Sequence, residues 1–316
     1  MNHSSRPKGP FACTVLDNHA IRECFWRMHL SLDKPGSEAF SKVNPGQFSE
    51  FDISGVASPP LEAVPAHLRD HLRHPVLLRR PFSFSDVTTI LTDQGPDSKM
   101  EILYCVLGPA TVRMTTLKTG DQISVIGPLG NGFWYPDDMK HAILIAGGMG
   151  SPPLQHLAAW MRKNLPDVRV TVFAGARSCE ELPFSLCIGN LTGIVLEEFQ
   201  RLGVPSFIAT DDGSAGYNGY VTQCADEWIE QNKPNSSDTV IFACGPEPML
   251  AQCAVLSQKW NIPCQVSMER MMACGIGLCQ SCAVEHKKEN PDETEYKLCC
   301  KDGPVFDSQR ILYMKH

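Results

Sequence analysis

The sequence has no long hydrophobic run, no basic run, no internal repeat and no low-complexity linker. The longest clean apolar stretch is residues 142–146, whereas a membrane-spanning helix needs about 20 such residues. The first twenty residues lack the apolar core of a secretory signal peptide. Lys plus Arg total 28 and Asp plus Glu total 35, a formal net charge of −7 that disfavours binding to nucleic acid or to an anionic membrane. Composition therefore predicts a cytoplasmic globular protein with neither of these partners.

Cysteine, by contrast, is abundant, with 14 among 316 residues. A reducing compartment argues against a disulfide framework. Nine cysteines are scattered, and the other five lie within 27 positions near the C-terminus: Cys274, Cys279, Cys282, Cys299 and Cys300. Scattered thiols are usually small buried hydrophobic groups, but a cluster of this kind more often holds a metal.

The clustered cysteines have the spacing C-x4-C-x2-C followed by a distant thiol, which is typical of plant-type 2Fe–2S ligation. Gly275 and Gly277 allow backbone conformations that bring amide groups close to the sulfurs. Structural zinc is the alternative, but zinc sites usually present two C-x2-C pairs and only one occurs here. Spacing favours iron–sulfur, and it leaves both Cys299 and Cys300 as candidates for the fourth ligand.

The N-terminal part of the chain has the alternation and turn residues of short β-strands. Strand-like runs occupy residues 21–30, 45–53, 76–84, 101–107 and 121–126, separated by Gly, Pro and Asp. Five or six short strands with no strong helix between them predict an antiparallel barrel. Residues 54–74 interrupt the pattern with three prolines and then a His/Arg-rich stretch, which predicts an insertion with two helical turns.

Beyond residue 140 strands and helices alternate. We expect strands at residues 141–146, 168–174, 206–210 and 239–243, and helices at 152–165, 221–232 and 247–259. This alternation predicts a doubly wound parallel α/β sheet. The last 50 residues show little regular periodicity. The predicted domains are residues 10–136 (with the insertion), 137–262 and 263–316.

Two turns join strands of this α/β region to helices: Ala-Gly-Gly-Met-Gly (146–150) and Ala-Cys-Gly-Pro (243–246). Free amide groups and the positive end of a helix dipole at such a turn can hold a pyrophosphate, although a plain tight turn also explains them. The segment Arg-Arg-Pro-Phe-Ser (79–83) combines arginine, an aromatic ring and a hydroxyl, which could pair a phosphate and stack a flat ring. An ordinary strand edge is the alternative interpretation.

The chain resembles the electron-transfer subunits of class-B dihydroorotate dehydrogenases, in the ferredoxin–NADP reductase superfamily, in the identity and order of its motifs. These motifs are RRPFS, GPLGNGF, AGGMGSPPL, ACGPEPML, MACGIGLCQSC and CKDGPVF. The resemblance runs from about residue 10 to the end. It implies an FAD-binding barrel, an NAD-binding α/β domain and a small C-terminal 2Fe–2S domain.

The resemblance also implies individual site residues. The FAD contacts would be Arg80, Pro81, Phe82, Ser83, Leu103, Tyr104, Cys105, Ala110 and Thr111; the family usually has a basic residue in place of Cys105 and glycine in place of Ala110. The nucleotide turns would contribute Gly147, Gly148, Gly150, Gly245 and Pro246. The cluster ligands would be Cys274, Cys279, Cys282 and Cys300. Cys244 matches a family residue near the flavin–nicotinamide contact, and we expect it to position the reacting groups.

The function implied is electron transfer between NAD and a separate FMN-containing subunit that oxidises dihydroorotate, in pyrimidine biosynthesis. The expected assembly is a heterotetramer of two copies of each subunit. One alternative is a flavin/iron–sulfur subunit of an NADPH:ferredoxin or sulfide reductase. Another is a zinc-stabilised adaptor without redox activity. Arg177 could contact the 2′-phosphate of NADP, so the sequence leaves open whether the dinucleotide is NAD or NADP.

Overall fold

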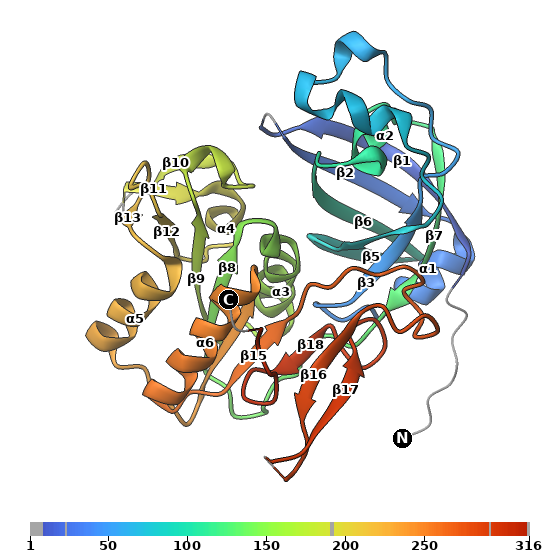
Figure 1. Cartoon of the computed structure of the whole chain (residues 1–316). Coiled ribbons are helices and arrows are strands. Elements are labelled where there is room, and N and C mark those ends of the chain that lie inside the picture. The colour runs from blue at the N-terminus through green and yellow to red at the C-terminus, as the bar shows by residue number, and fades with distance from the viewer. Residues whose placement is uncertain (1–8, 23, 190–192, 291, 315–316) are drawn as a thin grey trace.

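The computed structural model describes residues 9–22, 24–189, 193–290 and 292–314. Figure 1 shows an antiparallel β-domain, an α/β domain beside it, and a C-terminal β-hairpin next to both. Among the described residues, no helix combines the length and the apolar composition needed to cross a bilayer.

The N-terminal domain is a curled seven-stranded antiparallel sheet, as the strand pattern predicts (Figure 1). Its strands follow the spatial order β4 (Arg80–Ser83), β3 (Phe48–Asp52), β7 (Gln122–Leu129), β1 (Phe11–Ala20), β2 (Phe25–Leu32), β6 (Gly95–Cys105) and β5 (Asp86–Thr92). Two short helices, α1 (Lys34–Phe40) and α2 (Pro109–Met114), accompany it.

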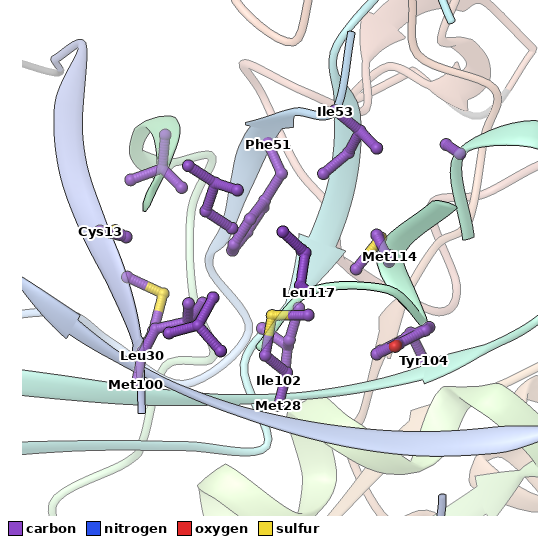
Figure 2. Close-up of a cluster of buried hydrophobic side chains, with 14 of the residues drawn as sticks. Cys13, Met28, Leu30, Phe51, Ile53, Met100, Ile102, Tyr104, Met114 and Leu117 are labelled. Atoms are coloured by element: carbon purple, nitrogen blue, oxygen red, sulfur yellow. The ribbon is translucent and has the colours of Figure 1, made fainter. Parts of the chain in front are cut away.

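Alternating side chains of the strands fill the space inside this sheet. Met28, Leu30 and Leu32 alternate along β2 with less buried residues, because successive strand residues face opposite sides. Figure 2 shows Met28 and Leu30 packed with Met100 from β6 and with Phe51 from β3. The hydrophobic core thus holds β3, which carries residues facing the site, firmly against the rest of the domain.

The predicted strands correspond to β2, β3, β4, β6 and β7, and the sheet also contains β1 and β5, which the pattern did not isolate. The predicted run 76–84 contributes only the four residues of β4. The insertion 54–74 forms two 3-10 segments, η1 (Leu61–Ala63) and η2 (Ala66–Arg73), each preceded by proline. Val64 and Leu68 from it are buried in the domain core.

The second domain is a seven-stranded sheet whose alternating connections confirm the doubly wound prediction. In order, it contains β13 (Tyr217–Asn218), β12 (Ser206–Thr210), β9 (Arg169–Ala176), β8 (His141–Gly147), β14 (Thr239–Cys244), β15 (Cys264–Ser267) and β18 (Val305–Asp307). All pairs are parallel except β15–β18.

Helices cover both faces of this sheet. One face packs with α3 (Ser151–Asn164), and the other packs with α5 (Val221–Asn232) and α6 (Glu247–Trp260). The peripheral hairpin β10 (Leu186–Gly189) and β11 (Gly193–Leu196) leads into α4 (Glu197–Arg201). After β8 the chain adds β9, β12 and β13 on one side of that strand and then returns to add β14, β15 and β18 on the other side. The direction in which strands are added therefore reverses between β8 and β14.

The C-terminal region contains more regular structure than its weak periodicity indicates. The hairpin β16 (Ala283–Lys287) and β17 (Thr294–Leu298) stands apart, whereas β15 and β18 extend the α/β sheet. The predicted limit between residues 262 and 263 falls just before β15. The four residues of β15 are too few to show periodicity, and only tertiary pairing reveals them as a strand.

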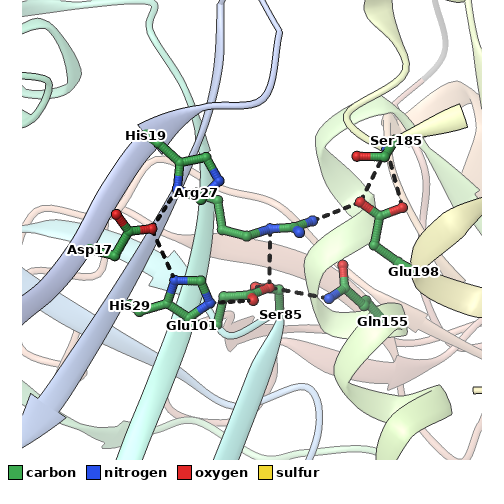
Figure 3. A network of polar contacts seen from close by, with 9 residues as sticks. All are labelled: Asp17, His19, Arg27, His29, Ser85, Glu101, Gln155, Ser185 and Glu198. Carbon is green, nitrogen blue, oxygen red and sulfur yellow. Dashed lines mark hydrogen bonds and ion pairs between the residues drawn. The ribbon is translucent and has the colours of Figure 1, made fainter. Parts of the chain in front are cut away.

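A polar network joins the two large domains (Figure 3). Arg27 of β2 bonds Glu198 of α4 at 2.8 Å, and Glu198 also accepts the amide of Ser185. Gln155 of α3 donates to Glu101 of β6 at 3.2 Å. Because the side chains of Arg27 and Glu198 are mostly buried, this ion pair is shielded from solvent screening. The network holds the domains at one mutual orientation over the site.

Candidate functional site

The first cavity, of about 410 Å³, opens between the two large domains and the segment that follows β15. We call it the flavin-motif cavity. It is lined by Arg80, Pro81, Phe82, Ser83, Leu103, Tyr104, Cys105, Ala110, Thr111, Gly150 and Cys244. These residues come from β4, from β6, from the start of α2 and from the turns after β8 and β14. The fold therefore brings together every residue that the resemblance assigned to FAD.

Local contacts set the side chains of this cavity. The Phe82 ring packs edge-on against Phe51 and Tyr104, with centroids 5.4 and 6.3 Å away. The Arg80 guanidinium donates to the carbonyl of Leu78 at 2.8 Å and has no carboxylate partner among the described residues. Its charge therefore remains for an anion such as a phosphate.

The two departures from the family pattern have clear local surroundings. Burial and the neighbouring Cys24 thiol raise the pKa of the Cys105 thiol to about 12, so this side chain is neutral. Ala110 is buried in α2. Thr111 holds the turn before that helix, since its hydroxyl oxygen accepts from the amides of Leu107 and Gly108 at 2.9 and 3.1 Å.

A second cavity, of about 660 Å³, lies at the carboxyl ends of the parallel strands; we call it the dinucleotide crevice. It is lined by Gly147, Gly148, Gly175, Ala176, Arg177, Glu181, Asp211, Tyr220, Pro246 and Met249, among others. The reversal of strand order between β8 and β14 is where open α/β sheets bind ligands. Gly147, Gly148 and Pro246 line this crevice, whereas Gly245 lines a third cavity beside it and Gly150 lines the flavin-motif cavity.

The two glycine turns touch each other, which explains their composition. A Cβ on Gly150 would lie 2.1 Å from the Cys244 carbonyl oxygen, and one on Gly147 would lie 2.6 Å from Met249 Sδ. The ends of β8 and β14 can approach this closely only without those side chains. Cys244 itself is buried, and burial raises its pKa to about 12, so its side chain is a neutral thiol between the two cavities.

The candidate ligands contact one another in two pairs, three of them in residues 274–282, which we call the cysteine loop, and the fourth at Cys300. The Cys279 amide donates to Cys274 Sγ at 3.4 Å, and the Cys300 amide donates to Cys282 Sγ at 3.4 Å. Hydrogen bonds from Ser281 lower the pKa of Cys279 to about 6, which favours the thiolate that metals require. Two pairs are the arrangement that two irons need, because each iron of a 2Fe–2S cluster takes two protein sulfurs.

Cys299 points elsewhere. Its thiol is fully buried and donates to the Met268 carbonyl at 3.2 Å, while Cys300 lies beside Cys282. Spacing alone does not distinguish these neighbours, and in the fold their side chains have different surroundings. Within the described ranges no group of three or more His, Cys, Asp or Glu side chains is arranged around a single ion position.

Sequence reasoning missed the segment that follows β15. Met268, Arg270 and Met272 line the flavin-motif cavity, and Arg270 forms a 2.9 Å ion pair with Glu247 at the start of α6. The sequence pattern of this segment is weak, since the segment lies between β15, which the pattern did not identify as a strand, and the cysteines. Glu50 of β3 was also missed; it is buried beside the loop at Gly275.

Two segments near this region expose large apolar side chains: Leu77 and Leu78 before β4, and Met271, Ile276 and Leu278 before and within the cysteine loop. Met271 is 90% exposed and Leu77 is 81% exposed. Leu78 and Met271 share the third cavity, of about 730 Å³, with Arg80, Gly245 and Ser281. Exposed apolar surface beside a cavity is of the kind that commonly marks a protein–protein contact.

Comparisons with known proteins agree with this arrangement. Residues 269–312 match the family model described as the iron–sulfur cluster binding domain of dihydroorotate dehydrogenase B. The chain is 32% identical over 272 residues to the dihydroorotate dehydrogenase B (NAD(+)) electron transfer subunit of Caldanaerobacter subterraneus, covering 86% of this chain and 88% of that one. The Bacillus velezensis subunit of the same name is 30% identical over 300 residues, covering 94% and 97%.

Solved structures support the fold. A structure described as an NADH-dependent reduced ferredoxin–NADP oxidoreductase superposes with a TM-score of 0.69 and 22% identity, over 95% of this chain and 89% of that chain. A ferredoxin NADP+ reductase from Neisseria gonorrhoeae superposes with a TM-score of 0.54 and 14% identity, over 84% and 96%. With relatives at 30% identity or more over most of its length, the chain belongs to the family of dihydroorotate dehydrogenase B electron transfer subunits.

Proposed function

We propose that this chain passes electrons between NAD and a dihydroorotate-oxidising partner subunit, as an oxidoreductase subunit of pyrimidine biosynthesis in the cytoplasm. The observation that carries the proposal is the adjacency of three sites: the dinucleotide crevice, the flavin-motif cavity and the paired cysteines. Gly150 and Cys244 connect the first two sites, and Met268–Met272 connects the second to the cysteine loop.

FAD is the cofactor that we assign to the flavin-motif cavity. A flavin accepts hydride from a nicotinamide and exchanges single electrons with a 2Fe–2S centre, and this is the chemistry it would supply here. Arg80 would pair its phosphates, and Phe82 would offer an aromatic surface held in place by Phe51 and Tyr104. Cys244, a neutral thiol, would position groups at the junction of the two cavities.

Cys274, Cys279, Cys282 and Cys300 are the residues that we assign to a 2Fe–2S cluster. The donor set fits, because four thiols stand as two pairs and one thiol already favours its thiolate. Gly275 and Gly277 both adopt positive φ, at 66° and 85°, so the loop can fold back on itself between the first two cysteines.

The partner would carry FMN and dock where Leu78 and Met271 expose apolar surface at the third cavity. This location favours electron exchange across the interface, since the cysteine loop itself exposes Ile276 and Leu278. We propose an assembly of two copies of each subunit. Light scattering of the co-purified complex measures that stoichiometry.

The test uses the co-purified pair and the variant Cys279→Ser. We expect dihydroorotate oxidation by NAD to fall at least 100-fold, while NADH oxidation by ferricyanide stays within threefold of wild type, because the latter needs only the flavin and dinucleotide sites. The matched control is Cys187→Ser, because Cys187 lies on the peripheral hairpin. This variant should keep both dihydroorotate oxidation and ferricyanide reduction. Equal dihydroorotate turnover in Cys279→Ser would contradict the proposed route.

Two alternatives give distinct results in the same preparation. Reduction of ferredoxin or polysulfide with NADPH, without dihydroorotate turnover, would favour the reductase alternative, which the likeness to the NADH-dependent ferredoxin–NADP oxidoreductase motivates. A colourless protein with one zinc and no flavin would favour the adaptor. The paired arrangement of the cysteines argues against that result.

A further inference from the structure

Glu50 is a buried carboxyl group without a hydrogen-bond partner. It lies in the middle of β3 with 0% exposure, and neither side-chain oxygen has a partner among the described residues. Burying a carboxyl group in this way costs several kcal/mol unless something compensates. A fold that keeps such a group at a cofactor site points to a role beyond packing.

Glu50 stands between the flavin motif and the cysteine loop. In the sheet it pairs with Pro81 of the flavin motif on one side and with Ile126 of β7 on the other. On the loop side its carboxyl group fills the place of a side chain on Gly275, since a Cβ there would lie 2.5 Å from Glu50 Oε1. The carboxyl therefore contacts the loop backbone one residue after Cys274.

Neighbouring positive charges do not neutralise Glu50 directly. Arg79 donates to the carbonyl of Ser124 at 2.9 Å and pairs with Asp52 at 3.4 Å, and Arg80 donates to backbone carbonyls. Burial raises the pKa of Glu50 to about 7, with a smaller contribution in the same direction from Cys279 of the cysteine loop, although Arg80 and Arg79 act in the opposite direction. Above that pH the group carries a negative charge beside the loop.

We propose that Glu50 is a positioning residue for the iron–sulfur site: its carboxyl group fixes the cysteine loop against the flavin-motif strand, and its negative charge disfavours an added electron on the cluster. This inference rests on the proposed function and deepens it. The loop contact at Gly275 fixes the spacing between sheet and cysteines. Removal of the charge makes reduction of the cluster easier, by Coulomb's law in a poorly solvated site.

The test is the variant Glu50→Gln in the complete, cluster-loaded chain, which keeps the side-chain size and removes the charge. We expect the equilibrium constant for one-electron reduction to rise about tenfold at about pH 8.5, a potential shift of about 59 mV. The readout is a redox titration followed by the electron paramagnetic resonance signal. Asp93→Asn, which removes the charge of an exposed carboxyl group in the turn between β5 and β6, is the control and leaves the constant within twofold.

A second readout tests the loop contact. Glu50→Asp keeps the charge but shortens the reach to Gly275, so iron release to a chelator should accelerate at least threefold while the cluster potential stays near that of wild type. If Glu50→Gln takes up no iron, the release rate of Glu50→Asp decides. Wild-type potential in Glu50→Gln, or unchanged iron release in Glu50→Asp, would overturn the respective half of the proposal. A wild-type chain without iron would instead sink the proposed function.

Discussion

Replacement of Gly150 by alanine tests how closely the two nucleotide turns must approach. The added Cβ would lie 2.1 Å from the Cys244 carbonyl oxygen, 2.3 Å from its carbon and 2.5 Å from the Gly245 amide nitrogen. All three are backbone atoms at the end of β14, so no flexible side chain can move aside. Relief requires the turns to separate by about 1 Å, and such overpacking costs about 1–3 kcal/mol.

This separation should weaken dinucleotide binding, because Gly147, Gly148 and Pro246 line the crevice from both turns. A cost of about 2 kcal/mol corresponds to a loss of about 30-fold in affinity. We expect the Kd for NADH, measured by fluorescence titration of Gly150→Ala, to rise by about that factor. NADH oxidation by ferricyanide should show the same loss in kcat/KM.

Gly55→Ala is the matched control, since Gly55 has negative φ and nothing within 4 Å of its added Cβ. It should bind NADH as wild type does. If Gly150→Ala also binds NADH within twofold of wild type, with an unchanged melting temperature, then the close approach of the turns has no part in forming the crevice.

Three further predictions concern stability and metal content. Burial lowers the pKa of His156 to about 4, so below the unfolded-state pKa of 6.5 the unfolded chain binds a proton that the folded chain does not bind. The free energy of unfolding, measured by urea titration, should therefore fall by about 2 kcal/mol from pH 7 to pH 5. The variant His156→Gln should remove that part of the decline. Cys300→Ser should lose most of the bound iron in a chelator assay, whereas Cys299→Ser should keep it; the reverse would exchange their roles. Glu198→Gln should lower the free energy of unfolding by about 2 kcal/mol, because Arg27 loses the shorter of its two largely buried ion pairs and keeps only the 3.5 Å contact with Glu101; an unchanged urea midpoint would refute this.

Much of the architecture could be predicted because it depends on local patterns. The α/β alternation after residue 140 follows from continuous apolar strands such as β8, whose seven residues are all buried. The strand β5 was missed because most of its residues are half-buried or exposed, so the alternation is faint. The strand β15 was missed because it is short, and pairing with β14 and β18 defines it.

The site divides in the same way. The spacing of Cys274, Cys279 and Cys282 is a covalent property of one loop, so the sequence by itself determined that three thiols could meet a metal cluster. The glycines of the nucleotide turns are equally local, since a close backbone approach excludes side chains wherever it occurs.

Only the tertiary structure shows that the neighbours Cys299 and Cys300 have different surroundings, because packing selects the direction of each side chain. It also placed Glu50 against Gly275, although 224 intervening residues separate them in the sequence. Such a contact depends on how whole sheets pack to bury their apolar faces, and no local pattern records it. The sequence thus supplied the chemical groups, and the packing of the domains determined which of them lie together.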